Sequence, residues 1–205
     1  MASYNRMPLY IKALNKLLKA GNEYCSAGTL AEMVRENPAV VKKDLQMVIS
    51  RPGKPRIGYE IIGAIKDIEE NLGYNMDKNA VLIGVGKLGQ ALLGYVGFEK
   101  YGFNILAGFD TNKEITGEII NGKEIYDIDS LQSYIKENKV LIAILTVPSK
   151  FAQEVANNVI QAGVRAIWNF APTHIIIPEN VVIKNEDMAS SLAILSKELI
   201  EIIRK

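Results

Sequence analysis

The chain has 205 residues, of which 48% are hydrophobic and 23% are charged, and its formal net charge is +1. This composition excludes a disordered chain, and no apolar run reaches the roughly 18 residues that span a bilayer or forms a secretory signal at the N-terminus. One cysteine, Cys25, and one histidine exclude an internal disulfide and a Cys/His metal site, so we expect a cytoplasmic protein without a metal.

The first 60 residues are basic. They contain 10 Lys and Arg against 5 Asp and Glu, whereas residues 61–205 contain 14 against 18. A local excess of positive charge favours an anionic partner. Double-stranded DNA is therefore the candidate partner of the N-terminal third.

Two helices are predicted in the first part of this basic segment. Residues 8–20 carry leucines at helical spacing and end at a glycine, the residues concerned being Leu9, Leu14, Leu17, Leu18 and Gly21. A second helix is predicted over about 29–36, where Thr29 and Glu32 form a capping box. Ser26 is the alternative N-cap if this helix begins earlier.

A third helix is predicted from Pro38 to about Ile49, because Asn37 is a favourable N-cap and proline is favoured at the first helical position. With the second helix it forms a helix-turn-helix pattern. Its two faces differ, with Val41, Leu45, Val48 and Ile49 inward and Lys42, Lys43 and Gln46 outward. The outward side chains are placed to enter a major groove.

A basic hairpin is predicted after the third helix, in "SRPGKPRIGYEI". Pro52-Gly53 fits the central positions of a type II turn, and basic residues flank it as in the wing of a winged helix. The candidate DNA contacts are therefore Ser26, Lys42, Lys43, Gln46, Arg51, Lys54 and Arg56. A solvated helix face followed by an ordinary surface hairpin is the alternative interpretation.

A linking helix is predicted over Glu60–Leu72, with Gly73 as its stop signal. From Ala80 onward strands alternate with helices, which predicts an α/β fold with a parallel sheet and helices on both faces. The expected strands are "AVLIG", "NILAGFD", "KEIYD", "VLIAILTV", "AIWNF" and "NVVIK", and the expected helices follow Gly89, span about 129–137 and 149–162, and end the chain. We divide the chain into a winged-helix DNA-binding domain with its linking helix, 1–78, a Rossmann-like domain, 79–186, and a C-terminal dimerisation helix, 187–205.

A Gly-x-Gly-x-x-Gly loop lies between the first strand and its helix. Gly84 permits a tight turn, Gly86 a close approach of the backbone to phosphate, and Gly89 close packing of the helix, whose N-terminus faces the pyrophosphate. Asp110 ends the next strand, 21 residues after Gly89, where an acid accepts hydrogen bonds from a ribose and repels a 2′-phosphate. The pattern predicts binding of NAD(H) rather than NADP(H), by Gly84, Val85, Gly86, Lys87, Leu88, Gly89 and Asp110. The alternative is that the glycines serve chain geometry only and that Asp110 caps a turn.

Two later strands end in proline turns, "LTVPS" and "NFAPT", at the edge where open parallel sheets bind ligands. Ordinary surface turns explain both segments equally well.

The chain leaves little room for a substrate domain, and its only histidine, His174, lies in an apolar segment that we expect to be buried or at a sheet edge. These features predict a protein that binds a dinucleotide and is not an enzyme.

The order of winged helix, linking helix, Rossmann domain and amphipathic terminal helix resembles the Rex family of redox-sensing transcriptional repressors, over essentially the whole chain. The segments that carry the resemblance are "KKDL", "GY" at 58–59, "GVGKLGQAL", "YVGFEKYGF", "AGFD", "AILTVP", "AQEVA", "AGVRAIWNFAP" and "VVIKNEDM". The resemblance implies a homodimer that binds an inverted repeat in DNA when NAD⁺ predominates and leaves it when NADH binds.

The resemblance also implies roles for residues outside the glycine loop. The turns that approach the nicotinamide are formed by Thr146, Val147, Pro148, Asn169, Phe170, Ala171 and Pro172. The terminal helix, with Leu192, Leu195, Leu199 and Ile202 at helical spacing, is expected to cross to the partner subunit, and the alternative is packing on its own sheet. Tyr95 and Asp187 are expected to form a switching contact with Lys12 of the partner subunit, and Met188 stands where the family often has an aromatic residue.

Some segments differ from the family pattern. The family usually has "RKDLS" followed by a Phe-Gly pair where this chain has "KKDLQMVIS", its wing is one residue longer, and Lys12 replaces an arginine. Lysine lacks the planar, two-donor guanidinium with which arginine binds guanine. We therefore do not assign the family's operator sequence to this chain. Three alternative functions are left: a NAD(H)-binding partner protein that has lost DNA recognition, a small NAD-dependent oxidoreductase, and a sensor of NADP(H).

Overall fold

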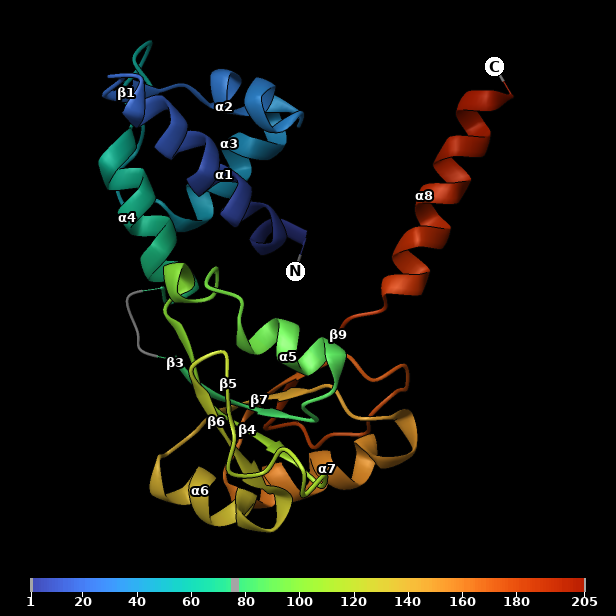
Figure 1. Ribbon diagram of the computed structural model, residues 1–205. Coiled ribbons are helices and arrows are strands. Elements are labelled where there is room, and N and C mark those ends of the chain that lie inside the picture. The colour runs from blue at the N-terminus through green and yellow to red at the C-terminus, as the bar shows by residue number, and fades with distance from the viewer. Residues whose placement is uncertain (1, 75–77, 205) are drawn as a thin grey trace. The chain divides into compact units, whose positions relative to one another are not determined.

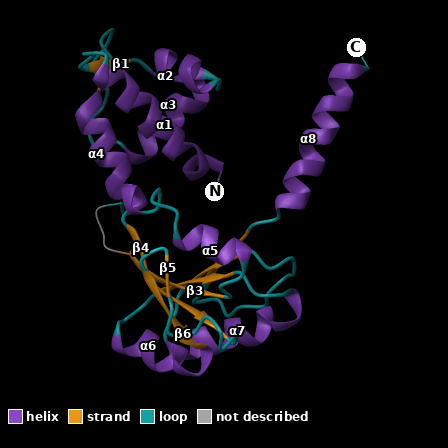
Figure 2. Ribbon diagram, viewed as in Figure 1, coloured by secondary structure: helices purple, strands orange, loops and turns teal. Residues whose placement is uncertain are grey.

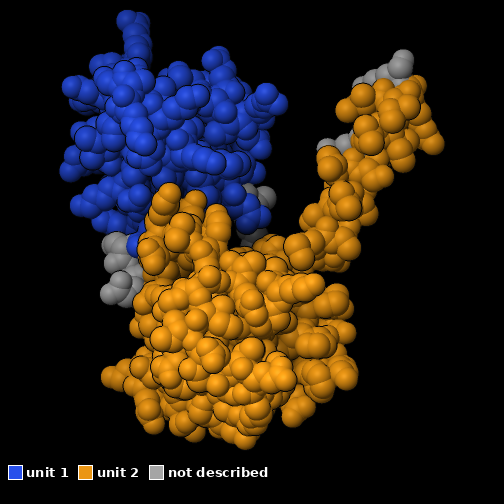
Figure 3. Space-filling model, in the orientation of Figure 1, with its two compact units in different colours: residues 1–76 blue, residues 77–205 orange. Residues whose placement is uncertain are grey.

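The computed structural model describes residues 2–74 and 78–204. The chain divides into two compact units, 1–76 and 77–205, which Figure 3 colours separately. Each unit has its own hydrophobic core. No helix in the described part of the chain is both long and apolar enough to cross a bilayer.

The first unit is a winged helix built around a helix-turn-helix. Its elements are α1 (Ala2–Lys19), β1 (Tyr24–Cys25), α2 (Ala27–Val34), α3 (Pro38–Val48), β2 (Tyr59–Glu60) and α4 (Ile61–Leu72). The strands β1 and β2 pair in antiparallel orientation at the base of the wing. The core contains fully buried side chains from all four helices, including Tyr10, Leu30, Leu45 and Ile68. Gly73, in the left-handed conformation with φ 67°, ends α4 as predicted.

The helix α1 begins earlier than predicted. It starts at Ala2 rather than at residue 8, so Pro8 lies inside the helix, where it removes one backbone hydrogen bond. Met7 and Tyr10 are fully buried, whereas Leu9, the first of the leucines at helical spacing, is 50% exposed. Burial of Met7 and the contacts of Arg6 stabilise the first turns enough to offset the proline. The buried face at this end of the helix is therefore formed by Met7 and Tyr10 rather than by Leu9.

The capping residues of α2 and α3 follow local rules. Ser26, the alternative cap, is the observed N-cap of α2, and its hydroxyl accepts the N–H of Thr29 at 3.0 Å. The capping box from Thr29 to Glu32 is therefore wrong, because α2 begins at Ala27. Asn37 caps α3 as predicted, with its side-chain oxygen 2.8 Å from the N–H of Ala39.

The turn of the wing lies later in the chain than predicted. Gly53 does not have a positive φ, so Pro52-Gly53 is not a type II turn. The turn instead lies within Lys54–Gly58, whose ends exchange two backbone hydrogen bonds of 2.8 and 2.9 Å. Arg56 and Gly58 both have a positive φ, at 63° and 102°. Gly58 is required here, because a Cβ on it would lie 2.3 Å from the carbonyl oxygen of Cys25.

The second unit is a sheet of seven strands with helices on both faces. Its elements are β3 (Lys78–Ile83), α5 (Lys87–Leu93), a 3₁₀ turn (Glu99–Tyr101), β4 (Phe103–Asp110), β5 (Ile119–Ile120), β6 (Lys123–Asp127), a second 3₁₀ turn (Ile128–Ser130), α6 (Leu131–Glu137), β7 (Ile142–Leu145), α7 (Ser149–Ala162), β8 (Ala166–Asn169), β9 (Val182–Asn185) and α8 (Met188–Ile203). Figures 1 and 2 show α5 on one face and α6 and α7 on the other.

The strand order is β5-β6-β4-β3-β7-β8-β9. All pairings are parallel except that of β5, an unpredicted short edge strand antiparallel to β6. The six parallel strands follow the dinucleotide-binding order 3-2-1-4-5-6, which confirms the predicted α/β fold. Alternate residues of β3 serve the two faces: Val81 and Ile83 belong to the core under α6 and α7, and Leu82 to the core under α5.

The helix α8 extends away from the sheet of its own unit (Figure 1). Its apolar side chains are exposed, with Leu192 67%, Leu195 59% and Leu199 54% accessible. The alternative prediction, that this stripe packs on its own sheet, is therefore wrong. A helix with such an exposed apolar face gains little stabilisation from burial in its own unit, so we expect that face to be covered by another surface.

Candidate nucleotide site and nucleic-acid interface

The glycine loop lies where the chain order of the sheet reverses, between β3 and β7. At this edge the Thr146 hydroxyl donates to the carbonyl oxygen of Gly84 at 2.6 Å, and the N–H of Thr146 donates to Ile83 at 2.9 Å. Open parallel sheets bind their ligands at such a switch point, outside the carboxyl ends of the strands. The loop and the "LTVP" turn are therefore brought together at the expected position.

The three glycines have three different physical roles. Gly84 has φ 94°, and a Cβ on it would lie 2.9 Å from the backbone of Thr146. A Cβ on Gly89 would lie 2.2 Å from the carbonyl oxygen of Gly84, so only glycine lets α5 pack this closely. Gly86 is different, because a Cβ on it would meet no protein atom within 4 Å. Its backbone faces open space, as a site of close approach to a ligand requires.

The carboxylate of Asp110 closes the other side of the loop. One of its oxygens accepts the N–H of Val85 at 2.6 Å, and the other accepts the N–H of Asn112 at 2.9 Å. Asp110 ends β4, the neighbour of β3, and is half-buried. Lys87 is exposed and Leu88 is half-buried, and both lie in the first turn of α5. This helix begins at Lys87, two residues before Gly89, and not after Gly89 as predicted. The predicted adenosine half of the site is thus assembled as one group.

The "NFAP" turn is organised by Asn169, which is fully buried. Its amide donates to Ala171, Thr173 and the Asn185 side chain at 2.9–3.2 Å, and its oxygen accepts the N–H of Ala171 at 2.9 Å. The Asn169 side chain therefore fixes the shape of the turn and connects it to the end of β9. Within this turn Phe170 is half-buried and Pro172 exposed, beside the exposed Pro148 and half-buried Val147 of the neighbouring strand end.

His174 is exposed rather than buried, and its segment forms no strand. That segment is held instead by Gln153, whose amide contacts both the N–H and the carbonyl of Ile176 at 2.8–2.9 Å. The glycine loop is held by Asp110 and Thr146, which lie on other strand ends, so His174 has no part in its geometry.

The predicted faces of α3 are confirmed. Lys42, Lys43 and Gln46 are exposed, while Val41, Leu45 and Val48 are buried. The wing residues Arg51, Lys54 and Arg56 are exposed, and a pocket between α3 and the wing is lined by Lys42, Gln46, Arg51 and Tyr59 among others. The Lys54 ammonium donates to the Tyr24 hydroxyl at 3.1 Å, which ties the wing to β1. The exposed Ser26 serves as the cap of α2.

An ion pair that the sequence interpretation missed holds α3 on α1. Asp44 is 3% exposed, and its carboxylate accepts two hydrogen bonds from the Arg6 guanidinium at 2.7 and 2.9 Å and one from the Tyr10 hydroxyl at 2.7 Å. The hydrogen bonds to Asp44 and Tyr10 raise the pKa of Arg6, while burial and then the bond to Asp44 raise the pKa of Tyr10 to about 12. The sequence does carry a sign of this burial. Helical spacing places Asp44 on the same face of α3 as Val41, Leu45 and Val48, which are buried.

The predicted switch residues lie in different parts of the chain. Tyr95 is 58% exposed and packs edge-on against Phe98 at 4.8 Å between ring centres. Asp187 caps α8 by accepting the N–H of Ser190 at 2.9 Å, and the Ser190 hydroxyl, also bonded to it, lowers the pKa of Asp187. Met188 is 66% exposed. Lys12 is exposed in the first unit, so its contact with the others stays a prediction.

The fold and the site define a class: DNA-binding proteins in which a winged helix is joined to a Rossmann dinucleotide-binding domain. The family described as "CoA binding domain" matches residues 75–173, and the one described as "Putative DNA-binding protein N-terminus" matches residues 1–46. The redox-sensing transcriptional repressor Rex of Treponema denticola is 42% identical over 94% of this chain and 91% of its own, and that of Clostridium acetobutylicum 34% over 98% and 94%. The chain belongs to the Rex family of redox-sensing transcriptional repressors.

Solved structures agree with this assignment over the whole chain. A Rex-family repressor, RSP, in complex with NAD⁺ and operator DNA has a TM-score of 0.91 and 32% identity, and covers 100% of this chain and 96% of its own. RSP in complex with NADH has a TM-score of 0.88 and 33% identity, with 98% and 94% coverage. These relatives are repressors rather than enzymes.

Proposed function

We propose that this chain is a transcriptional repressor that senses the NADH/NAD⁺ ratio: it binds operator DNA with NAD⁺ or without ligand, and NADH releases it. The observation that carries the proposal is that one chain combines an exposed basic face on α3 and the wing with a complete glycine loop closed by Asp110. RSP, which this chain resembles from end to end, is bound in its structures to NAD⁺ with operator DNA and to NADH.

The residues at the switch point fit a dinucleotide. The backbone of Gly84–Gly89 would hold the pyrophosphate, and Asp110 keeps lone pairs for the adenosine ribose beyond its two backbone contacts. The turns Thr146–Pro148 and Asn169–Pro172 would border the nicotinamide half. The nicotinamide supplies the difference in charge and shape between NAD⁺ and NADH, and the protein responds only by binding the two forms with different affinity in its two states. No bond is made or broken.

The exposed face of α8 supports a homodimer, in which this helix would cross to the partner subunit and bury its apolar stripe. A two-fold dimer recognises an inverted repeat when its recognition helices lie about one helical turn, roughly 34 Å, apart. Rotation of the nucleotide domains would change that distance, with Tyr95, Asp187 and Lys12 of the partner subunit as the switching contact. Such a protein acts in the cytoplasm, where the DNA and both nucleotides are found.

Replacement of Gly86 by alanine is expected to weaken NADH binding by about tenfold or more without destabilising the protein. The backbone at Gly86 has φ −72°, which alanine adopts freely, and the added methyl group meets no protein atom. It would contact only a bound pyrophosphate. Titration of protein fluorescence with NADH, together with thermal unfolding of the free protein, measures both quantities.

The matched control is Gly28→Ala in α2, where the added Cβ makes one ordinary contact, 3.5 Å from the Ser26 hydroxyl. It should leave the NADH affinity unchanged. An NADH affinity that Gly86→Ala does not alter would place the pyrophosphate away from this loop.

The function itself is tested by incubating the purified protein with fragmented genomic DNA, once with NAD⁺ and once with NADH, and sequencing the retained fragments. We expect a shared inverted repeat in the NAD⁺ sample that is lost with NADH, because the two ligands favour different separations of the recognition helices. Failure to enrich any fragment in either sample, with NADH binding intact, would favour a nucleotide-binding partner protein that has lost DNA recognition.

A further inference from the structure

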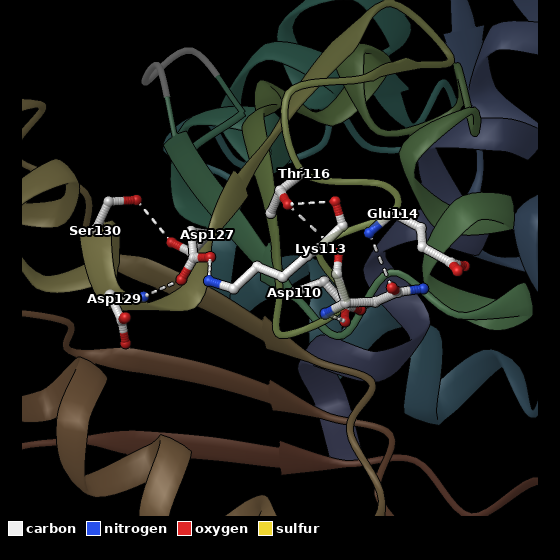
Figure 4. Close-up of polar contacts among 8 residues, drawn as sticks. Asp110, Lys113, Glu114, Thr116, Asp127, Asp129 and Ser130 are labelled. Atoms are coloured by element: carbon white, nitrogen blue, oxygen red, sulfur yellow. Dashed lines mark hydrogen bonds and ion pairs between the residues drawn. The ribbon is translucent and has the colours of Figure 1, made fainter.

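A charged cluster lies at the carboxyl ends of β4 and β6, beside the proposed ribose site (Figure 4). Asp110 and Asp127 are register partners at the ends of these two parallel strands. Register partners on adjacent strands lie about 5 Å apart and direct their side chains to the same face of the sheet. Two carboxylates are therefore presented side by side at the edge where the adenosine half of a dinucleotide would lie.

The loop after Asp110 directs a lysine toward the second of these acids. Figure 4 shows the Lys113 side chain extending from this loop to Asp127, with which it forms an ion pair. The loop is shaped by its own hydrogen bonds: the Asn112 side chain accepts the N–H of Glu114 at 3.0 Å, and the Thr116 hydroxyl donates to the carbonyl of Lys113 at 3.1 Å. The lysine of this loop is thus already held by an acid.

The ion pair shifts the pKa values of both Asp127 and Lys113. The hydrogen bond from Lys113, followed by the N–H of Asp129 at 3.0 Å, lowers the pKa of Asp127, and the bond to Asp127 raises the pKa of Lys113. Both groups are therefore charged at neutral pH. A 2′-phosphate on the adenosine ribose would need a free cation and would meet Asp110 and Asp127 instead.

We propose that Asp127 determines specificity for the unphosphorylated ribose, because it occupies the ammonium of Lys113 and adds a second negative charge beside Asp110. This inference rests on the proposed binding of NAD(H). It assigns the exclusion of NADP(H) to a pair of acids and to an occupied lysine rather than to Asp110 alone. Without Asp127, Lys113 is free to bind a 2′-phosphate.

The test is fluorescence titration of the full chain with NADH and with NADPH. Asp127→Asn is expected to increase the NADPH affinity about tenfold while the NADH affinity changes less than about threefold. The gain should disappear when Lys113→Ala is added, since the free ammonium would provide the attraction. The gain should also shrink at high salt, because the Lys113 ammonium is exposed to solvent.

The matched control is Asp129→Asn, which removes the same charge two residues away without breaking the ion pair with Lys113. It is expected to change the NADPH/NADH affinity ratio less than about threefold. An unchanged ratio in Asp127→Asn, or a gain that persists in the double variant with Lys113→Ala, would overturn the inference. A wild-type chain that binds neither nucleotide would instead contradict the proposed function.

Discussion

Replacement of Asp44 by alanine is expected to lower the free energy of unfolding of the winged-helix unit by about 3 kcal/mol. Asp44 is 3% exposed and is the acceptor for both the Arg6 guanidinium and the Tyr10 hydroxyl, so its removal leaves a fully buried hydroxyl and a guanidinium without their partner. Operator binding is expected to weaken as well, because the ion pair that connects α3 to α1 is absent. Urea unfolding measures the first effect, and NADH titration shows that the other unit is intact.

A triple variant separates charge from packing. Arg6→Met, Tyr10→Phe and Asp44→Leu together remove these three polar side chains, and replacement of a buried ion pair by apolar groups is often neutral for stability. We expect this variant to recover most of the stability that Asp44→Ala loses. Glu32→Ala, the loss of an exposed acid in α2, should change the free energy of unfolding by less than about 0.5 kcal/mol. Wild-type stability of Asp44→Ala would contradict the role given to this cluster.

Removal of three basic side chains, Lys42, Lys43 and Arg56, is expected to lower DNA affinity on the order of 10³-fold. All three are exposed, on the outer face of α3 and at the tip of the wing, and both subunits of a dimer would lose these charges. The slope of log K against log salt should become shallower by about 0.9 for each DNA phosphate that the variant no longer neutralises. Fluorescence anisotropy with a labelled operator at several salt concentrations measures both, and the NADH affinity should not change.

The control for total charge is the replacement of Lys100, Lys136 and Lys139, three exposed lysines of the second unit, by alanine. This variant has the same net charge as the first and should retain DNA binding. An equal loss in both variants would mean that DNA responds to overall charge and not to the face formed by α3 and the wing.

The nucleotide loop was predictable because its requirements are local. The tight turn at Gly84, the close packing of α5 at Gly89 and the acid that ends the next strand are set by neighbouring backbone and by a fixed chain spacing. The two faces of α3 and its N-cap at Asn37 were predictable for the same reason, since helical periodicity and capping act within a few residues.

Other features needed contacts between residues far apart in the chain. The start of α1 before Pro8 depends on Asp44, 38 residues beyond Arg6, and the hydrogen bonding of the Asn169 side chain depends partly on Asn185. The position of the turn in the wing depends on Gly58 fitting against Cys25. The pairing of Lys113 with Asp127 exists only because β4 and β6 lie side by side.

Periodicity, capping and spacing over short stretches of chain were therefore enough to predict the fold class, the glycine loop with Asp110 and the basic face of α3. Folding was needed to establish which polar groups are buried, which face of α1 lies inside, and that the apolar stripe of α8 is left exposed by its own unit. Burial and pairing are properties of surfaces that come together only when the chain has folded.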